Sequence, residues 1–129
     1  MSAYGFGKIL ESTTVEQARP RVTEALAAEG FGVLTEIDLQ ATLRAKLGVE
    51  HRPYLILGAC NPALANQAVG IDPDIGLMLP CNVILREVDG GTRVSIVDPQ
   101  AMFGVMEGQT LQPVADEAEA RLRRALAAM

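Results

Sequence analysis

The stretch LPCNVILREVDGGTRVSIVD, residues 79–98, carries the clearest structural signal in the chain. Two runs rich in aliphatic and β-branched residues, 79–88 and 92–98, flank the tripeptide Asp89-Gly90-Gly91. Asp-Gly and Gly-Gly pairs between such runs are typical of β-hairpin turns, because glycine adopts the positive φ angles that these turns require. The stretch therefore predicts two antiparallel strands joined by a tight turn.

Three further strands are expected upstream of this hairpin. Short apolar runs bounded by turn residues predict strands over Tyr4–Leu10, Phe31–Asp38 and Arg52–Cys60. The last of these is apolar on both of its faces, which is typical of a strand inside a sheet rather than at its edge.

Two longer helices complete the main elements. Thr13 and Glu16 match a capping box, and helical spacing of apolar residues then continues as far as Gly30. Pro20 conflicts with this helix because it removes an internal hydrogen bond, so we expect a kink or a later start. Leu111–Ala127 predicts a second amphipathic helix, with acidic residues early and arginines late, as the helix dipole favours.

The order of main elements is therefore strand, helix, four strands, helix. Strands that do not alternate with helices favour an antiparallel sheet, so we expect an α+β fold with both main helices packed on one face. The GIDPDIG segment, residues 70–76, is expected to be a loop. Short helical insertions are expected after the second, third and fifth strands: Leu39–Leu47 ended by Gly48, Ala63–Val69 after Pro62, and a turn from Pro99 with Met102, Val105 and Met106.

The composition is that of one folded domain, residues 1–129, with 49% hydrophobic and 21% charged residues. The net charge of -5 disfavours nucleic acid as a partner, since phosphate recognition depends on clustered Lys and Arg. The start, MSAYGFGKIL, has no signal-peptide pattern, and the longest apolar runs fall far short of the ~20 residues that span a bilayer. We expect a soluble cytoplasmic protein with no membrane partner and with reduced cysteines.

Four phrases of the sequence carry a resemblance to a known family: VLTEIDLQATLRAKLG at 33–48, RPYLILGACNP at 52–62, IGLMLPCNVILRE at 75–87 and IVDP at 96–99. They resemble the DUF302 family, a domain of unknown function. The resemblance implies a TBP-like β-α-β-β-β-β-α topology and a homodimer. It implies no activity, catalytic residue or cofactor, and TBP-like describes topology alone, without support for DNA binding.

Both cysteines of the chain precede an asparagine, in GACNP at 58–62 and LPCNV at 79–83. If the third and fourth strands pair antiparallel, the end of one lies beside the start of the other. We therefore expect Cys60, Asn61, Cys81 and Asn82 to mark one site.

Four interpretations of these cysteines stay open. A disulfide would stabilise by ~3 kcal/mol on the chain-entropy model, although in a reducing cytoplasm it would act as a switch. A reactive thiol is the second, because a helix that starts at Pro62 would direct its free N–H groups toward Cys60. A metal site is the third, but two thiolates are too few for a closed zinc site, and His51 lies about 30 Å of extended strand from Cys60. The fourth is that both cysteines are core residues, with the asparagines bound to turn backbone and His51 on the surface.

Carboxylates offer a weaker candidate site. Glu36 and Asp38 alternate onto one face of a strand and can present paired carboxylates to a ligand. Asp38 also precedes the helix that starts at Leu39, so we favour a helix-capping role for it. Common hydrolase and nucleotide-binding motifs are absent from the sequence.

Three hypotheses follow for function. The first is a homodimeric module that binds a small ligand or senses thiol redox state at the Cys-Asn motifs, with the apolar run Ile75–Leu79 lining the pocket or the subunit interface. The second is a thiol-dependent enzyme, for sulfur transfer or redox chemistry, with Cys60 as nucleophile. The third is a purely structural dimeric module. The sequence identifies no cofactor.

Overall fold

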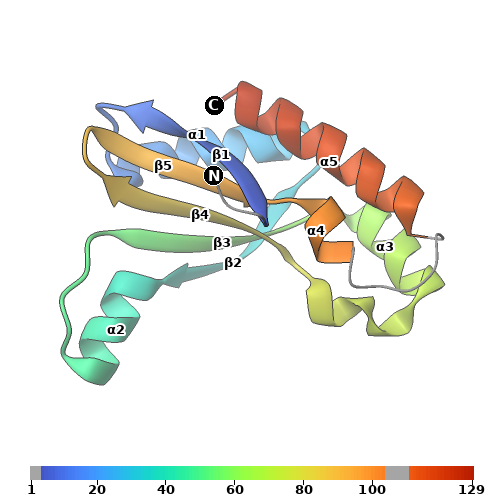
Figure 1. Cartoon of the computed structure of the whole chain (residues 1–129), viewed down its shortest axis with the longest axis horizontal. Coiled ribbons are helices and arrows are strands. Elements are labelled where there is room, and N and C mark those ends of the chain that lie inside the picture. The colour runs from blue at the N-terminus through green and yellow to red at the C-terminus, as the bar shows by residue number, and fades with distance from the viewer. Residues whose placement is uncertain (1–3, 104–110) are drawn as a thin grey trace.

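The computed structural model describes residues 4–103 and 111–129. Five strands form one antiparallel sheet in the order β1-β5-β4-β3-β2, which confirms the predicted antiparallel architecture (Figure 1). Each predicted strand is present within a few residues of its expected limits. The strands are β1 (Gly5–Glu11), β2 (Gly32–Asp38), β3 (Tyr54–Cys60), β4 (Cys81–Val88) and β5 (Gly91–Val97).

The predicted hairpin is the centre of the sheet. Val88 pairs with Gly91, so Asp89 and Gly90 form a two-residue turn, and Gly90 has a φ of 90°. A side chain at Gly90 would be strained in this left-handed conformation, which explains why the turn needs glycine. The same register pairs Glu87 with Thr92 and continues along both strands.

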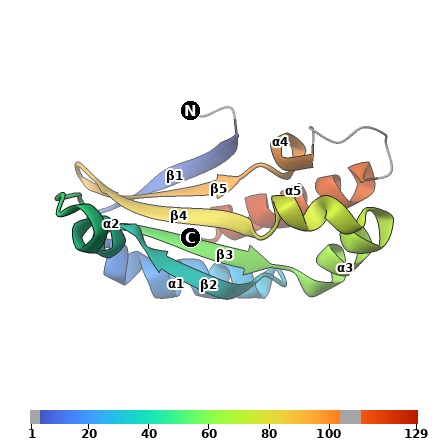
Figure 2. The ribbon, with the colours of Figure 1, turned by 90° about the horizontal axis from the view of Figure 1, so that it is seen from below.

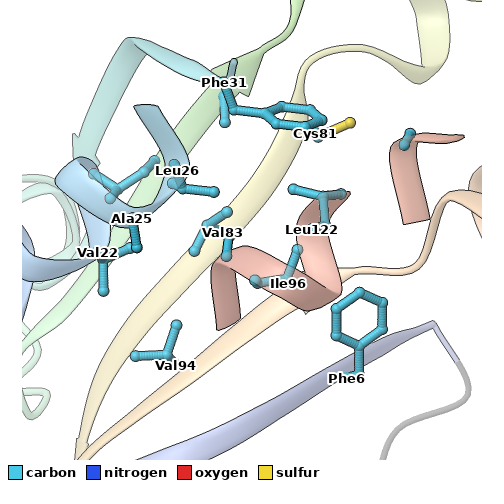
Figure 3. Close-up of a cluster of buried hydrophobic side chains, with 14 of the residues drawn as sticks. Phe6, Val22, Ala25, Leu26, Phe31, Cys81, Val83, Val94, Ile96 and Leu122 are labelled. Atoms are coloured by element: carbon cyan, nitrogen blue, oxygen red, sulfur yellow. The ribbon is translucent and has the colours of Figure 1, made fainter. Parts of the chain in front are cut away.

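The two main helices, α1 (Val15–Ala28) and α5 (Gln112–Ala127), cover the same face of the sheet (Figures 1 and 2). Their apolar side chains pack against the inward residues of β4 and β5 and form the core shown in Figure 3. Completely buried members include Val22, Leu26, Val83, Val94 and Leu122. The α+β architecture with both main helices on one face is thereby confirmed.

The start of α1 differs from the sequence prediction by one residue. The capping box consists of Thr14 and Gln17, not of Thr13 and Glu16, because the Thr14 side chain accepts a hydrogen bond from the Gln17 backbone N–H at 3.0 Å. Pro20 lies inside α1 and does not end it. Burial of the apolar face of α1 offsets the hydrogen bond that this proline removes.

Shorter helices lie mainly at the two ends of the sheet, with α2 at one end and α3 at the other (Figures 1 and 2). The three predicted insertions are confirmed, although Val105 and Met106 lie outside the described residues. The segment predicted as a loop instead ends α3 and begins a 3-10 helix, in which the Asp72 side chain accepts from the Asp74 N–H at 3.0 Å. These elements are α2 (Leu39–Leu47), α3 (Pro62–Ile71), the 3-10 helix η1 (Pro73–Met78) and α4 (Pro99–Phe103).

The other face of the sheet, which we call the open face, lies opposite α1 and α5. Side chains alternate between the two faces along each strand, so the neighbours of buried core residues point to the open face. Ile84, Arg86, Arg93 and Ser95 are half-buried there. Within the two described ranges, no helix is long and apolar enough to cross a bilayer.

Candidate functional site

The junction between β3 and α3 forms one side of the candidate site. Cys60 is the last residue of β3, Asn61 is the N-cap of α3, and Pro62 is its first residue. The Asn61 Oδ1 accepts a hydrogen bond from the Leu64 backbone N–H at 3.2 Å. Proline is favoured at the first helical position because its missing N–H has no helical partner there. The helix start predicted at Pro62 is confirmed.

The start of β4 forms the other side of the site. β3 and β4 are antiparallel, and Ala59 pairs directly with Cys81. Cys60 follows Ala59 and therefore lies near Cys81 at this end of the sheet, despite the twenty residues between them in the chain. Both are free thiols.

Both cysteines line one small cavity, which we call the thiol cavity. Its volume is about 30 Å³, enough for one or two water-sized groups. Asn61 is the amide-bearing residue of its lining, and it is itself only 8% exposed. The apolar wall includes Phe31, Leu64, Leu79, Phe103 and Val114.

Cys81 belongs to the hydrophobic core, as Figure 3 shows. Burial raises the pKa of the Cys81 thiol to about 11, and the negative charge that Cys60 can carry contributes in the same direction. A low-dielectric environment disfavours the thiolate, so Cys81 stays protonated at neutral pH. Cys60 is half-buried and is the more accessible of the two sulfur-bearing residues. The two thiols therefore have different chemical roles available to them.

Asn82 does not join the other three residues of the Cys-Asn motifs. It is exposed and lines a separate hollow on the open face, whereas Cys81 points into the core. The reason is that successive side chains of a strand point to opposite faces. Cys60, Asn61 and Cys81 thus line one cavity, whereas Asn82 lines another.

The carboxylate candidates have structural partners elsewhere. Glu36 forms an ion pair with Arg19 of α1 at 2.7 Å. Asp38 is the N-cap of α2, and its Oδ1 accepts from the Ala41 N–H at 2.9 Å, which confirms the favoured capping role. The two side chains do not form a paired carboxylate site.

The remaining sequence candidates are dispersed. His51 is exposed before β3, at the end of the strand opposite Cys60, and its carbonyl oxygen accepts from Gln40 Nε2 at 2.8 Å. The run Ile75–Leu79 is divided: Ile75 is completely buried, Leu77 is 87% exposed, and Leu79 lines the thiol cavity. Among residues 4–103 and 111–129, no three His, Cys, Asp or Glu side chains gather as metal ligands.

One feature of the open face was missed by the sequence analysis. Arg86 of β4 pairs directly with Arg93 of β5, and both line a hollow of about 680 Å³. The signal was present in the sequence, because a two-residue turn at Asp89-Gly90 places residues three before and three after it opposite each other. What the hairpin register cannot show is whether the two guanidinium groups have acidic partners.

The comparisons with known proteins agree with one another. The family model described as "Domain of unknown function DUF302" matches residues 8–129. A solved structure described as an uncharacterized conserved protein DUF302 from Bacillus stearothermophilus is 28% identical, with a TM-score of 0.89 and 98% of each chain covered. No sequence among the curated proteins matches this chain. The chain therefore belongs to the DUF302 family, a family of domains whose function is unknown.

Proposed function

We propose that the chain is a small-ligand-binding or thiol-sensing module whose site is the thiol cavity. The observation that carries the proposal is that one cavity is lined by both cysteines of the chain and by the nearly buried Asn61. Apolar pockets with a few convergent polar groups are the usual form of small-molecule sites. Packing alone does not require a second thiol at this position.

The two cysteines have different roles in this proposal. Cys60 is half-buried at the end of β3 and acts as the reactive thiol. Cys81 stays protonated, because burial raises its pKa to about 11, and acts as a neutral wall of the cavity. Asn61 uses its Oδ1 to cap α3, which leaves its amide nitrogen to orient a polar ligand.

The small volume restricts the ligand to a few non-hydrogen atoms. Hydrogen peroxide fits this limit in the reducing cytoplasm that the sequence predicts. In that reaction the Cys60 thiol loses its proton, the thiolate sulfur attacks one peroxide oxygen, and the O–O bond breaks. Hydroxide leaves with the bonding electrons and takes up the proton as water. The product is a sulfenic acid at Cys60, which cellular thiols reduce again.

The test is separate measurement of modification at each cysteine by mass spectrometry. Native protein is treated with hydrogen peroxide and dimedone, which labels sulfenic acids, and in parallel with iodoacetamide between pH 6 and pH 10. We expect dimedone on Cys60 only, with alkylation of Cys81 delayed until the protein unfolds. Cys81→Ala is the matched control, and it should keep the labelling of Cys60. If both thiols stay inert in the native protein, the proposal is wrong and the structural interpretation stands.

A second candidate function is a thiol-dependent enzyme for sulfur transfer or redox chemistry. It is favoured by the position of Cys60, which is half-buried, lines the thiol cavity and directly precedes Asn61, the N-cap of α3. This candidate requires catalytic turnover. A sulfane-sulfur donor, such as thiosulfate, gives its outer sulfur to the Cys60 thiolate and leaves as sulfite, and an acceptor thiol then takes that sulfur and regenerates Cys60. A persulfide that forms but is never transferred would leave sensing as the function.

The homodimer implied by the family resemblance remains part of this proposal. Light scattering on the purified full chain gives its mass in solution directly. A mass of one chain, about 13.7 kDa, over the whole concentration range would remove the dimer from the proposal without affecting the thiol cavity.

A further inference from the structure

Arg86 and Arg93 are unusual among the nine arginines of this acidic chain. Six others form ion pairs, and Arg21 donates to the Met129 carbonyl oxygen at 2.8 Å. Within residues 4–103 and 111–129, the side chains of Arg86 and Arg93 have neither an ion pair nor a hydrogen bond. The two arginines without partners among the described residues, Arg86 and Arg93, are thus the two that are directly opposed in the sheet.

Their positions in the sheet make this arrangement costly. Arg86 and Arg93 are directly opposed on neighbouring strands, where like charges destabilise the pairing. Both side chains are half-buried, so water screens their repulsion less than on an open surface. A negatively charged group between the guanidiniums would remove the repulsion and accept charge-assisted hydrogen bonds from both.

The hollow around the arginines has the size of a small-molecule site. Its volume is about 680 Å³, within the range of pockets that hold metabolite-sized ligands. Ser95, Asn82 and Tyr54 add polar groups to its lining, while Ile84 and Val97 add apolar surface. One region can therefore contact a charged group and an apolar group of the same molecule.

Glycines of β1 lie beside this hollow. Gly5 lines it, and Gly7 pairs with Ser95, which also lines it. A Cβ atom at Gly7 would collide with the Val94 carbonyl oxygen, so glycine allows β1 and β5 to approach closely here. Gly7, in a Gly-Phe-Gly sequence that matches no nucleotide-binding motif, is thus explained by the pairing of β1 with β5.

We propose that the open face binds a small organic acid, whose carboxylate or phosphate lies between Arg86 and Arg93 and whose apolar part lies against Ile84 and Val97. This oxyanion site is separate from the thiol cavity, since Asn82 lines the first and Cys81 the second from opposite faces of the sheet. It does not depend on the reactivity of either cysteine.

The test is isothermal titration calorimetry on the full chain at low ionic strength. The probes are phenyl phosphate, benzoate and inorganic phosphate, with benzyl alcohol as the neutral counterpart. We expect saturable binding of at least one of the two aromatic anions, weaker binding of inorganic phosphate and none of benzyl alcohol. The relative affinities of phenyl phosphate and benzoate distinguish a phosphate ester from a carboxylate as the natural ligand class.

Charge-matched variants locate the binding. Arg86→Gln and Arg93→Gln should each weaken the aromatic anion roughly ten- to hundredfold, the range expected for a lost charge-assisted hydrogen bond. Arg44→Gln removes the same charge from an exposed site on α2 and should change affinity less than about twofold. Arg86→Lys, which keeps the charge but loses the planar fork, should give an intermediate affinity and remains informative if a glutamine variant does not fold.

Two results would overturn the proposal. One is that no anionic probe saturates the wild-type chain, or that Arg44→Gln weakens binding as much as Arg86→Gln and Arg93→Gln. The other is that Arg86→Gln and Arg93→Gln dissociate a dimer in light scattering while no probe binds, because the arginines would then face a second copy of the chain.

Discussion

The buried thiol of Cys81 predicts a loss of stability at alkaline pH. Burial raises its pKa from an ordinary value of 9.0 to about 11 in the folded chain. As the pH rises, the unfolded chain therefore loses this proton near pH 9, whereas the folded chain keeps it until about pH 11. The unfolded state binds fewer protons in this window, so the free energy of unfolding falls.

The size of the effect follows from the difference between the two pKa values. Each pH unit of difference corresponds to about 1.4 kcal/mol, which gives an upper limit of about 3 kcal/mol for full ionisation. Roughly 2 kcal/mol of this should be lost between pH 8 and pH 10.5, where the unfolded thiol is mostly ionised and the folded thiol mostly protonated. Domains of this kind are stable by only about 5–15 kcal/mol, so the loss is large enough to measure.

Urea unfolding followed by circular dichroism at several pH values measures this directly. Other groups also titrate above pH 9, so the informative quantity is the stability difference between the wild type and Cys81→Ala. We expect the free energy of unfolding of the wild type, minus that of Cys81→Ala, to fall by about 2 kcal/mol between pH 8 and pH 10.5. Cys60→Ala should keep most of the pH dependence, because burial is the larger cause of the raised pKa. A wild-type and Cys81→Ala difference that stays constant within about 0.5 kcal/mol would refute the reasoning.

Three other predictions concern single side chains. Asn61→Ala should lower the free energy of unfolding in urea by about 1 kcal/mol, because it removes the cap of α3. Asn82→Ala on the open face should change it by less than about 0.5 kcal/mol. Equal losses for the two variants would contradict the different roles of Asn61 and Asn82. Gly7→Ala should destabilise by roughly 1–3 kcal/mol through its collision with β5, and an unchanged thermal midpoint would argue against the close approach. Thr14→Ala should lower the free energy of unfolding by about 1 kcal/mol and Thr13→Ala by clearly less, because Thr14 caps α1. A larger loss for Thr13→Ala would mean that Thr13 is the cap.

Local patterns determined much of the fold. The Asp89-Gly90-Gly91 tripeptide predicted the hairpin, because glycine tolerates the positive φ that Gly90 adopts in the turn. Asp38 and Pro62 marked the starts of α2 and α3 through hydrogen-bond and φ preferences that act within one helical turn. Antiparallel pairing of β3 and β4 then brought the end of β3 next to the start of β4, and both cysteines line one cavity there.

Local patterns predicted helix starts less accurately where two neighbouring residues can both act as the N-cap. Thr13 and Thr14 are both suitable caps, and the choice between them depends on which residues of α1 face the sheet. Burial of the apolar face of α1 selects Thr14 and also accommodates Pro20.

The sequence by itself determined the main strands and helices and the antiparallel class of the sheet, because these depend on preferences of residues close along the chain. Only the tertiary structure decided which groups share an environment. It separated Asn82 from Asn61, paired Glu36 with Arg19, and left Arg86 and Arg93 facing each other without acidic partners among the described residues. Such outcomes depend on the distances and burial of groups far apart in the sequence, and electrostatic interactions change steeply with both.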